Sequence, residues 1–386
     1  MLQVQRMKRN NDINMNRLVL IGNGFDLAHN LKTKYEDFFY WYWNYRLSQI
    51  VKNPSIKTSE DILCKLESHG RETFFMTLMY DVGFVSMETS EGKEIYNKII
   101  KNRGIDKEFS PLFDRIKNSI EIKGWVDIEY EYYSLLCLLF NQEKGNYQNL
   151  NNQLDYLRMM LIAYLKIATK HEVALINDIK EKIYQPIKQR EVAVSDKKIV
   201  DESIKDTLPS NIMLLNFNYT KTPELYLTES PNVFLNYIHG SLDAPKSVIF
   251  GYGDELDEGY MKLKNSNNNE CLRFVKSIRY LESDHYRKVL EFIESGPFQI
   301  SIMGHSCGNS DRTLLNTLFE HRNCVSIVPY YYIKDDGTDN YLELVQNISR
   351  NFTDMKLMRD RVVNKTYSEP LVEKKEEKRK PEMRKK

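Results

Sequence analysis

The sequence predicts an α/β protein with a Rossmann-type, mostly parallel sheet and a large helical insertion. Three observations support this class. An apolar strand, Leu18–Ile21, runs directly into a glycine turn near the start of the chain. After residue 210, short apolar runs alternate with helical segments, which favours a parallel sheet. Between these two parts, helical spacing dominates and strand-like runs are scarce.

The first α/β unit is expected at residues 17–50. The glycine turn after Leu18–Ile21 is followed by the aromatic-rich segment 27–46, whose apolar spacing predicts a helix packed on the sheet. Strand, glycine loop and helix in this order are typical of a nucleotide-binding unit. We assign residues 1–16 to a flexible, basic N-terminus.

Residues 51–209 are expected to form the helical insertion, with helices at 128–142, 150–168 and 172–185 and a charged return linker at 188–209. The sheet domain then resumes over 210–360. Its expected strands are 212–217, 233–238, 247–250, 299–303, 325–328 and 355–358, and its expected helices are 311–320 and 341–352. Residues 361–386 form a charged tail that we expect to be disordered.

Composition excludes several classes of protein. With 41% hydrophobic and 28% charged residues, the chain is typical of globular proteins. Its apolar runs, such as Leu135–Phe140, are far shorter than the roughly 18 residues that a membrane helix needs, and the basic, polar start does not resemble a signal peptide. We therefore expect a cytoplasmic protein without membrane contact.

Charge and cysteine content exclude further kinds of partner and site. The net charge is +1, but residues 1–17 carry +3 and residues 373–386 carry +4, which leaves −6 for the body between them. An acidic body does not favour nucleic acid as a partner. The five cysteines include no C-x-x-C pair, so we expect neither a disulfide framework nor a zinc site, and no metal.

Polar turns follow four of the expected strands: Gly22–Asp26, Asn216–Thr220, Ile238–Ser241 and Gly304–Gly308. In an open parallel sheet the carboxyl ends of the strands line one crevice, where ligands bind. We therefore expect these turns to be neighbours in space.

The first turn combines phosphate-binding and ribose-binding features. Gly22, Asn23 and Gly24 would allow the backbone to approach a phosphate at a helix N-terminus, although a simple tight turn explains two glycines equally well. A carboxylate repels phosphate, so Asp26 is expected to accept hydrogen bonds from ribose hydroxyls or to cap the helix.

The next two turns offer a base and a positioning group. His239 at a strand end is a candidate general base, because its ordinary pKa lies near neutrality, whereas a lone histidine is more often structural. Asn218 could hold a water or a sugar hydroxyl, or it could bond its own turn. The acidic residues of Trp125–Glu131 are explained by a favourable interaction with a helix dipole.

The run Leu18–Phe38 resembles the N-terminal signature of the bacterial abortive-infection AbiH family. The segments Trp125–Glu129, Phe217–Thr220, Ile238–Gly240 and Gly304–Ser306 resemble its later signatures in the same order, and the similarity spans about residues 17 to 330. This resemblance implies an anti-phage effector, with a phage-derived activator or a defence protein as a partner and room for a homo-oligomer.

The same turns are similar in order to those of sirtuin-like NAD-binding domains. The resemblance implies that Asn218 and His239 are catalytic and that NAD contacts Gly22, Asn23, Gly24, Asp26, Asn218, Tyr219, Gly304, Ser306 and Asp311. Thr220 stands where many sirtuin-like proteins have aspartate, and the alanine and arginine of the sirtuin cofactor loop are missing after Gly24.

Deacylating sirtuins carry a four-cysteine zinc module that this chain lacks, so the resemblance implies an NAD glycohydrolase, with NAD as substrate. Two alternatives stay open. One is a nucleotide-binding sensor or partner-binding protein without turnover. The other is a serine hydrolase, because Gly304–Gly308 matches G-x-S-x-G, with Ser306 as nucleophile and Asp311 and His321 as partners.

Overall fold

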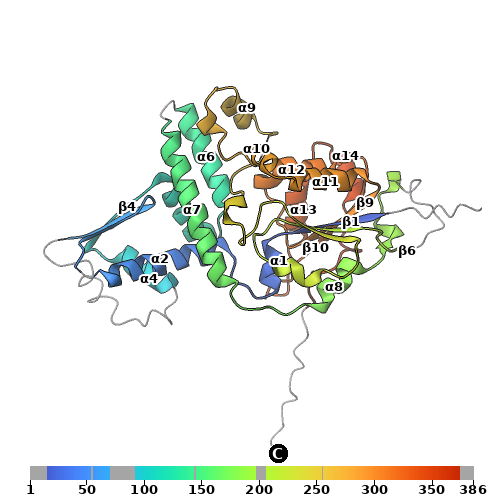
Figure 1. Cartoon of the computed structure of the whole chain (residues 1–386), viewed down its shortest axis with the longest axis horizontal. Coiled ribbons are helices and arrows are strands. Elements are labelled where there is room, and N and C mark those ends of the chain that lie inside the picture. The colour runs from blue at the N-terminus through green and yellow to red at the C-terminus, as the bar shows by residue number, and fades with distance from the viewer. Residues whose placement is uncertain are drawn as a thin grey trace, which may run out of the picture.

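The computed structural model describes residues 15–53, 55–69, 92–142, 145–196, 206–253 and 255–373. Its main sheet has five strands, all parallel, in the order β10-β9-β1-β7-β8 (Figure 1). The strands are β1 (Asn16–Ile21), β7 (Ile212–Asn216), β8 (Val233–Tyr237), β9 (Phe298–Met303) and β10 (Cys324–Tyr330). The prediction of an α/β protein with a mostly parallel sheet is confirmed.

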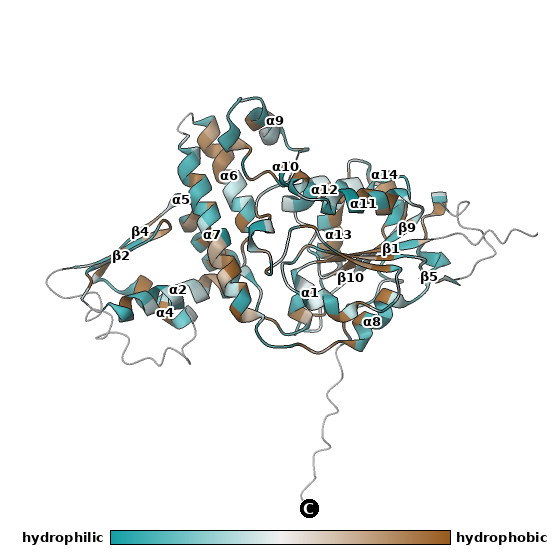
Figure 2. Ribbon diagram, viewed as in Figure 1, coloured by the Kyte–Doolittle hydropathy of each residue, from teal (hydrophilic) through white to brown (hydrophobic). Residues whose placement is uncertain are grey.

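Strand β1 lies at the centre because both of its faces are apolar. Leu18 and Leu20 point to one face and Val19 and Ile21 to the other, and all four are fully buried. A strand covered on both faces needs a continuous apolar run, which Leu18–Ile21 supplies. Figure 2 shows this apolar character along the central strands.

Helices cover both faces of the sheet. On the Leu18 side pack α11 (His285–Glu294), α12 (Arg312–Phe319), α13 (Tyr341–Arg350) and α14 (Met355–Arg361). On the Val19 side lie α1 (Asn23–Ala28) and α8 (Asn177–Tyr184) (Figure 1). The strand order reverses at β1, since β7 and β8 lie on one side of it and β9 and β10 on the other.

The long segment between β1 and β7 is mostly helical, with α2 (Tyr35–Lys52), α4 (Gly92–Lys101), α5 (Pro111–Lys123), α6 (Ile128–Asn141) and α7 (Tyr147–Ala168). It also holds a small antiparallel sheet of β2 (Thr58–Glu60), β3 (Cys64–Ser68) and β4 (Ile105–Phe109), which the sequence did not predict. A two-stranded pair, β5 (Ile187–Lys188) with β6 (Asp206–Thr207), closes the segment.

One hydrophobic core joins this segment to a later part of the chain. Residues between 242 and 275, which include α9 (Glu258–Lys264), pack with the helices α2, α5, α6 and α7. Tyr133 of α6 donates a hydrogen bond to Asp257, and Asn151 of α7 donates to the carboxylate of Glu270 at 2.7 Å. The stretch that follows β8 is therefore bound to the insertion as well as to the sheet.

Three predicted elements are wrong. The helix expected at 27–46 is two helices, because the chain turns at Asn30, where φ is 61°. The strand expected at 247–250 joins no sheet, since its apolar side chains fill the core shared with the insertion. The strand expected at 355–358 is the start of α14, because the Asp354 side chain caps the first turn by accepting from Lys356 N and Leu357 N.

The predicted terminal segments are residues 1–16 and 361–386. Of these, residues 1–14 and 374–386 lie outside the described residues. Within the expected tail, residues 362–373 lie beside β10, with bridges from Ile327 to Val362 and from Tyr331 to Pro370. Among the described helices, none is both long and apolar enough to cross a membrane.

Candidate functional site

The four polar turns meet at the carboxyl edge of the sheet, beside the point between β1 and β9 where the strand order reverses. Gly24 N donates to Gly304 O at 2.8 Å, and Phe217 N donates to Ile21 O at 2.9 Å. Ile238 N also donates to Asn216 O at 3.1 Å. In open α/β sheets this position is where ligands bind.

The glycines of the first turn allow it to pack against the turn after β9. A side chain at Gly22 would meet the Cα of His305 at 2.5 Å, and one at Gly24 would meet the Cα of Gly304 at 2.8 Å. The Gly22 and Gly24 amides are already bonded, to Met303 O and Gly304 O. Close packing thus accounts for both glycines, and their contact with a phosphate stays a prediction.

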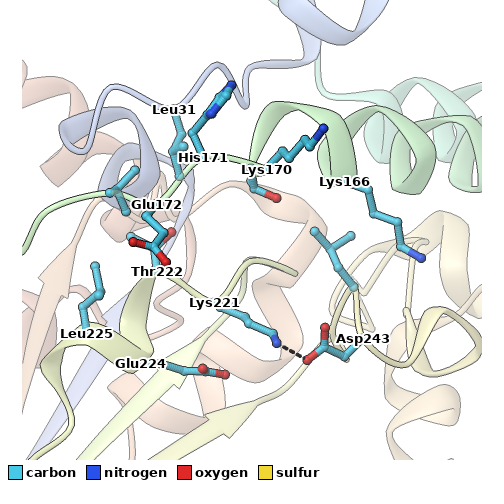
Figure 3. A pocket seen from close by; sticks show the side chains of 13 residues that line it. Leu31, Lys166, Lys170, His171, Glu172, Lys221, Thr222, Glu224, Leu225 and Asp243 are labelled. Carbon is cyan, nitrogen blue, oxygen red and sulfur yellow. Dashed lines mark ion pairs between the residues drawn. The ribbon is translucent and has the colours of Figure 1, made fainter.

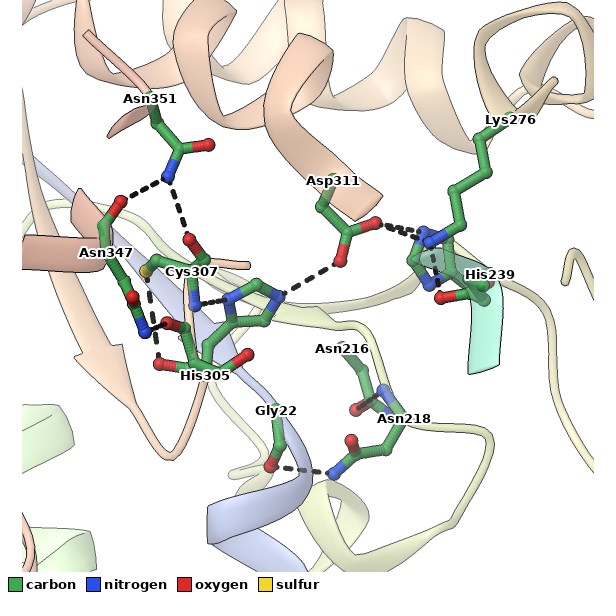
Figure 4. Close-up of polar contacts among 12 residues, drawn as sticks. Gly22, Asn216, Asn218, His239, Lys276, His305, Cys307, Asp311, Asn347 and Asn351 are labelled. Atoms are coloured by element: carbon green, nitrogen blue, oxygen red, sulfur yellow. Dashed lines mark hydrogen bonds and ion pairs between the residues drawn. The ribbon is translucent and has the colours of Figure 1, made fainter. Parts of the chain in front are cut away.

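Asn218 braces this packing from the turn after β7. Its side-chain amide donates to Gly22 O at 2.9 Å, and its backbone amide donates to Asn216 Oδ1 at 3.0 Å (Figure 4). The first bond joins the β1 and β7 turns, and the second fixes the shape of the β7 turn. The structural role that the sequence left open for Asn218 is present, while its proposed contact with water or ribose stays untested.

Three further residues predicted to contact the ligand have protein partners. Asp26 is buried, and Thr220 Oγ1 donates to its Oδ2 at 2.7 Å, while its Oδ1 has no partner among the described residues. Burial raises the pKa of Asp26 to about 6. Asn23 Oδ1 accepts from Thr33 at 2.5 Å, and the buried Tyr219 hydroxyl donates to Ile249 O at 3.1 Å.

His239 is held by two groups on one of its ring nitrogens. Its Nε2 lies 3.3 Å from Asp311 Oδ1 and 3.1 Å from the Tyr280 hydroxyl, whose ring is stacked on the imidazole. Nδ1 has no hydrogen-bond partner among the described residues. A carboxylate on one nitrogen favours the tautomer that leaves the other free to accept a proton, so His239 can act as a base through Nδ1.

His305 differs from His239 because both of its nitrogens are engaged. Cys307 N donates to His305 Nδ1 at 3.0 Å, and Nε2 lies 3.6 Å from Asp311 Oδ2. The Phe217 ring packs on the imidazole with centroids 4.2 Å apart. His305 is thus a fixed neighbour that orients Asp311, and His239 is the candidate base.

A buried lysine, Lys276, joins His239, His305 and Asp311 in one cluster of polar side chains. Lys276, the first residue of α10 (Lys276–Arg279), places Nζ 2.8 Å from Asp311 Oδ1 and 3.0 Å from Glu129 Oε2 (Figure 4). The other oxygen of Glu129 accepts from Gly251 N at 2.8 Å. Glu129 comes from the first turn of α6, so the insertion supplies one of the ionisable groups at the site.

The surroundings shift the pKa values of the two carboxyl groups, Asp311 and Glu129, in opposite directions. Although burial opposes it, the Lys276 cation with His239 and His305 holds the pKa of Asp311 well below its ordinary value. Burial raises the pKa of Glu129 to about 8, despite Lys276. Burial and the nearby Lys276 cation lower the pKa of His239. His239 is therefore neutral near pH 7, as a base requires, beside an ionised Asp311.

Among the described residues no histidine is hydrogen-bonded to the Ser306 side chain, and both ring nitrogens of the neighbouring His305 are engaged elsewhere. Ser306 is exposed, and its carbonyl accepts from Asn347 Nδ2 at 2.9 Å. His321, the proposed partner of a serine nucleophile, instead contacts Glu294 at 3.3 Å and accepts from Asn323 N at 3.2 Å. The serine-hydrolase alternative therefore lacks its histidine.

A cavity of about 1000 Å³ lies beside Lys221 and Thr222, which directly follow the Asn216–Thr220 turn (Figure 3). It is lined by residues of the α7 C-terminus, the turn after β7 and the loop after His239, among them Lys170, Thr222 and Asp243. None of the cluster around Asp311 lines it. The four polar turns and the buried groups with strongly shifted pKa values meet around Asp311, so we place the candidate site there and not in the cavity.

Sequence reasoning brought His239, Asn218 and Asp311 to one edge of the sheet, and the structure places them there. It missed Lys276, which stands in no recognisable motif, and it explained Glu129 only by the helix dipole. Asp127, which precedes this helix, caps it by accepting from Tyr130 N at 3.0 Å. Among the described residues no group of His, Cys, Asp and Glu side chains is arranged to hold a metal ion.

Comparison with known families gives one match. The family model described as "Bacteriophage abortive infection AbiH" matches residues 18–332. That span includes all four turns, Glu129 and Lys276. No curated protein matches the chain.

Proposed function

The chain belongs to the bacteriophage abortive infection AbiH family, which indicates a role in abortive infection, and from this premise we propose that it acts by cleaving NAD. The reaction proposed is hydrolysis of the bond between nicotinamide and ribose. The observation that carries the proposal is the pair His239 and Asp311 at the carboxyl edge of the sheet, where His239 is neutral and has a free ring nitrogen. The ordered resemblance of the four turns to sirtuin-like domains supports NAD as the substrate.

The proposed hydrolysis needs a base, a carboxylate and a group that positions the ribose and the water. Nicotinamide leaves with the electrons of the glycosidic bond, which neutralises its ring, and water adds to the ribosyl carbon. His239 Nδ1 accepts the proton that this water loses, and Asp311 stabilises the resulting imidazolium. The ionised Asp311 also stabilises the positive charge that develops on the ribosyl group. Asn218 is proposed to orient the ribose and the water.

We expect His239→Ala and Asn218→Ala each to abolish most of the NAD loss and toxicity. Removing an acid–base group typically costs about 10²–10⁴-fold in rate. The measurement is nicotinamide release and NAD content in cells that express the full chain, with and without phage. His321→Ala is the matched control, because this histidine pairs with Glu294 away from the site.

Two results would contradict the proposal. One is a toxic protein that leaves cellular NAD unchanged. The other is full toxicity in both variants while they fold like the parent chain.

A non-catalytic nucleotide sensor is the second candidate, and the burial of the site favours it. His239 is only 3% exposed, so little of it is accessible to a substrate in the described conformation. A sensor would bind NAD without releasing nicotinamide, and calorimetry with product analysis separates the two functions. Ser306→Ala should keep much of the activity under either function, and covalent labelling of Ser306 by a fluorophosphonate would support the hydrolase alternative instead.

A further inference from the structure

Lys276 is the only described cation in contact with the acid of the candidate site, and it joins three parts of the chain there. It belongs to the segment after β8, Asp311 directly precedes α12, and Glu129 belongs to the insertion. Lys276 is 1% exposed, and its two ion pairs are 2.8 and 3.0 Å long. A lysine is almost never buried this deeply unless it is paired.

We infer that Lys276 is a positioning residue that sets the protonation of His239 through Asp311, and that Glu129 of the insertion anchors it. The identity of the reaction rests on the proposed function, but the effect on His239 does not. The insertion thereby becomes part of the active site, because α6 supplies one of the two carboxyl groups that hold Lys276.

The geometry supports this division of roles. Asp311 Oδ1 is shared, since it lies 2.8 Å from Lys276 Nζ and 3.3 Å from His239 Nε2. A cation on the same carboxylate oxygen competes with the imidazolium for that oxygen. Among the described residues Glu129 contacts Lys276 and Gly251 N and forms no hydrogen bond or ion pair with His239, so it acts on the base only through the lysine.

The groups that face His239 come from several elements. Asp311 precedes α12, His305 follows β9, Lys276 begins α10, and Tyr280 begins the short 3-10 helix Tyr280–Glu282. Lys276 and His305 oppose a charge on His239, while Asp311 favours one. The pKa of His239 is sensitive to Lys276, because Lys276 is the fixed positive charge among these four neighbours.

The test is an NMR titration of His239 in the full chain, with the ring signal assigned by its loss in His239→Ala. In Lys276→Met the pKa of His239 should rise by about one unit, because the competing cation is gone while Asp311 remains. Lys276→Arg keeps the charge and should restore most of the low value. Glu129→Gln leaves the cation in place, so the pKa should stay low or fall further.

A folded Lys276→Met protein with an unchanged His239 pKa overturns the inference, and so does a rise of equal size in Glu129→Gln. If Lys276→Met does not fold, the double variant Glu129→Gln/Lys276→Met removes the pair as a unit, and it should still raise the pKa. Glu191→Gln, a buried carboxylate bonded to Gln299 and Lys188, controls for general loosening.

Activity gives an independent readout. If the protein cleaves NAD, the acid limb of its pH–rate profile should move to higher pH in Lys276→Met, since more alkaline conditions are needed to free the base. If neither the parent chain nor any variant cleaves NAD in the presence of extract from phage-infected cells, but the titration shifts as expected, the proposed function fails and the role of Lys276 stands. A profile that keeps its acid limb while kcat falls would contradict a role through His239.

Discussion

Two histidines at the site show how local bonding divides the roles of identical side chains. Both rings approach the same carboxylate, Asp311, and both are buried. The amide of Cys307 occupies the second nitrogen of His305, whereas the second nitrogen of His239 is free among the described residues. The sequence motifs contain both histidines, but only the bonding partners decide which one can accept a proton.

Asp26 predicts a pH dependence of stability at the residue scale. Its pKa is about 6 in the fold and 3.8 ordinarily, so its contribution is fully present below pH 3.8 and is lost as the pH rises through 6. At pH 7 the buried charge therefore costs on the order of 3 kcal/mol. Asp26→Asn should remove this cost and raise the free energy of unfolding at pH 7.

Denaturant unfolding at several pH values measures the effect. The difference between Asp26→Asn and the parent chain should shrink as the pH falls from 7 to 4, because the parent carboxyl group then becomes neutral. A variant that is less stable at pH 7 would show that Thr220 stabilises the charged form more strongly than burial opposes it. Asp284→Asn, which changes a carboxylate in an exposed ion pair, is the control.

Among the secondary-structure elements, the turns after β1 and β9 are in close backbone contact. Gly304 has φ of 77°, and a side chain there would meet Phe25 N at 2.1 Å. Both the left-handed conformation and the close approach therefore require glycine at this position. The contact brings α1 and the β9 turn together at the edge where the candidate base lies.

Gly304→Ala should separate these turns, and we expect it to cost on the order of 3 kcal/mol or more of stability. Gly124→Ala is a matched control, because Gly124 has φ of 72° but nothing within 4 Å of an added side chain. That change should cost only about 1 kcal/mol, the penalty of the left-handed conformation. Equal losses in thermal or denaturant unfolding would mean that the close approach adds nothing.

Helices and strands were predictable where the spacing of apolar residues alone determines the secondary structure. The apolar strands β1, β7, β9 and β10 and the amphipathic helices α12 and α13 follow from spacing alone. The strand Thr58–Glu60 was missed because it is short and polar, and 247–250 was misassigned because its apolar side chains serve a helical core instead of a sheet. Local spacing does not distinguish these two environments.

At the scale of the whole molecule, the site depends on contacts that no local pattern contains. Glu129 and Lys276 are 147 positions apart, and Asp311 lies 35 positions after Lys276. The parallel sheet predicts that the four turns meet, because parallel strands end at one edge. It does not predict which charge the insertion brings to that edge, since this depends on how α6 and the segment 242–275 pack together.

The same packing closes the site, and this leads to a prediction about the intact protein. Glu129 is bonded to Gly251 N and to Lys276, so these bonds join α6 to the segment after β8 beside the buried base. If the protein cleaves NAD, we expect these contacts to open when a substrate reaches His239. We therefore expect the purified full chain to release little nicotinamide, and the protein in phage-infected cells to release much more.

Hydrogen exchange can test whether opening accompanies activity. The Gly251 amide, which donates to the buried Glu129, should exchange slowly in the resting protein and faster after addition of the extract from infected cells that activates it. The amides of β1, at the centre of the sheet, should stay protected in both states and serve as the internal reference. Rapid cleavage of NAD by the resting protein with Gly251 still protected would mean that substrate reaches His239 by another route, and that docking of the insertion does not control the site.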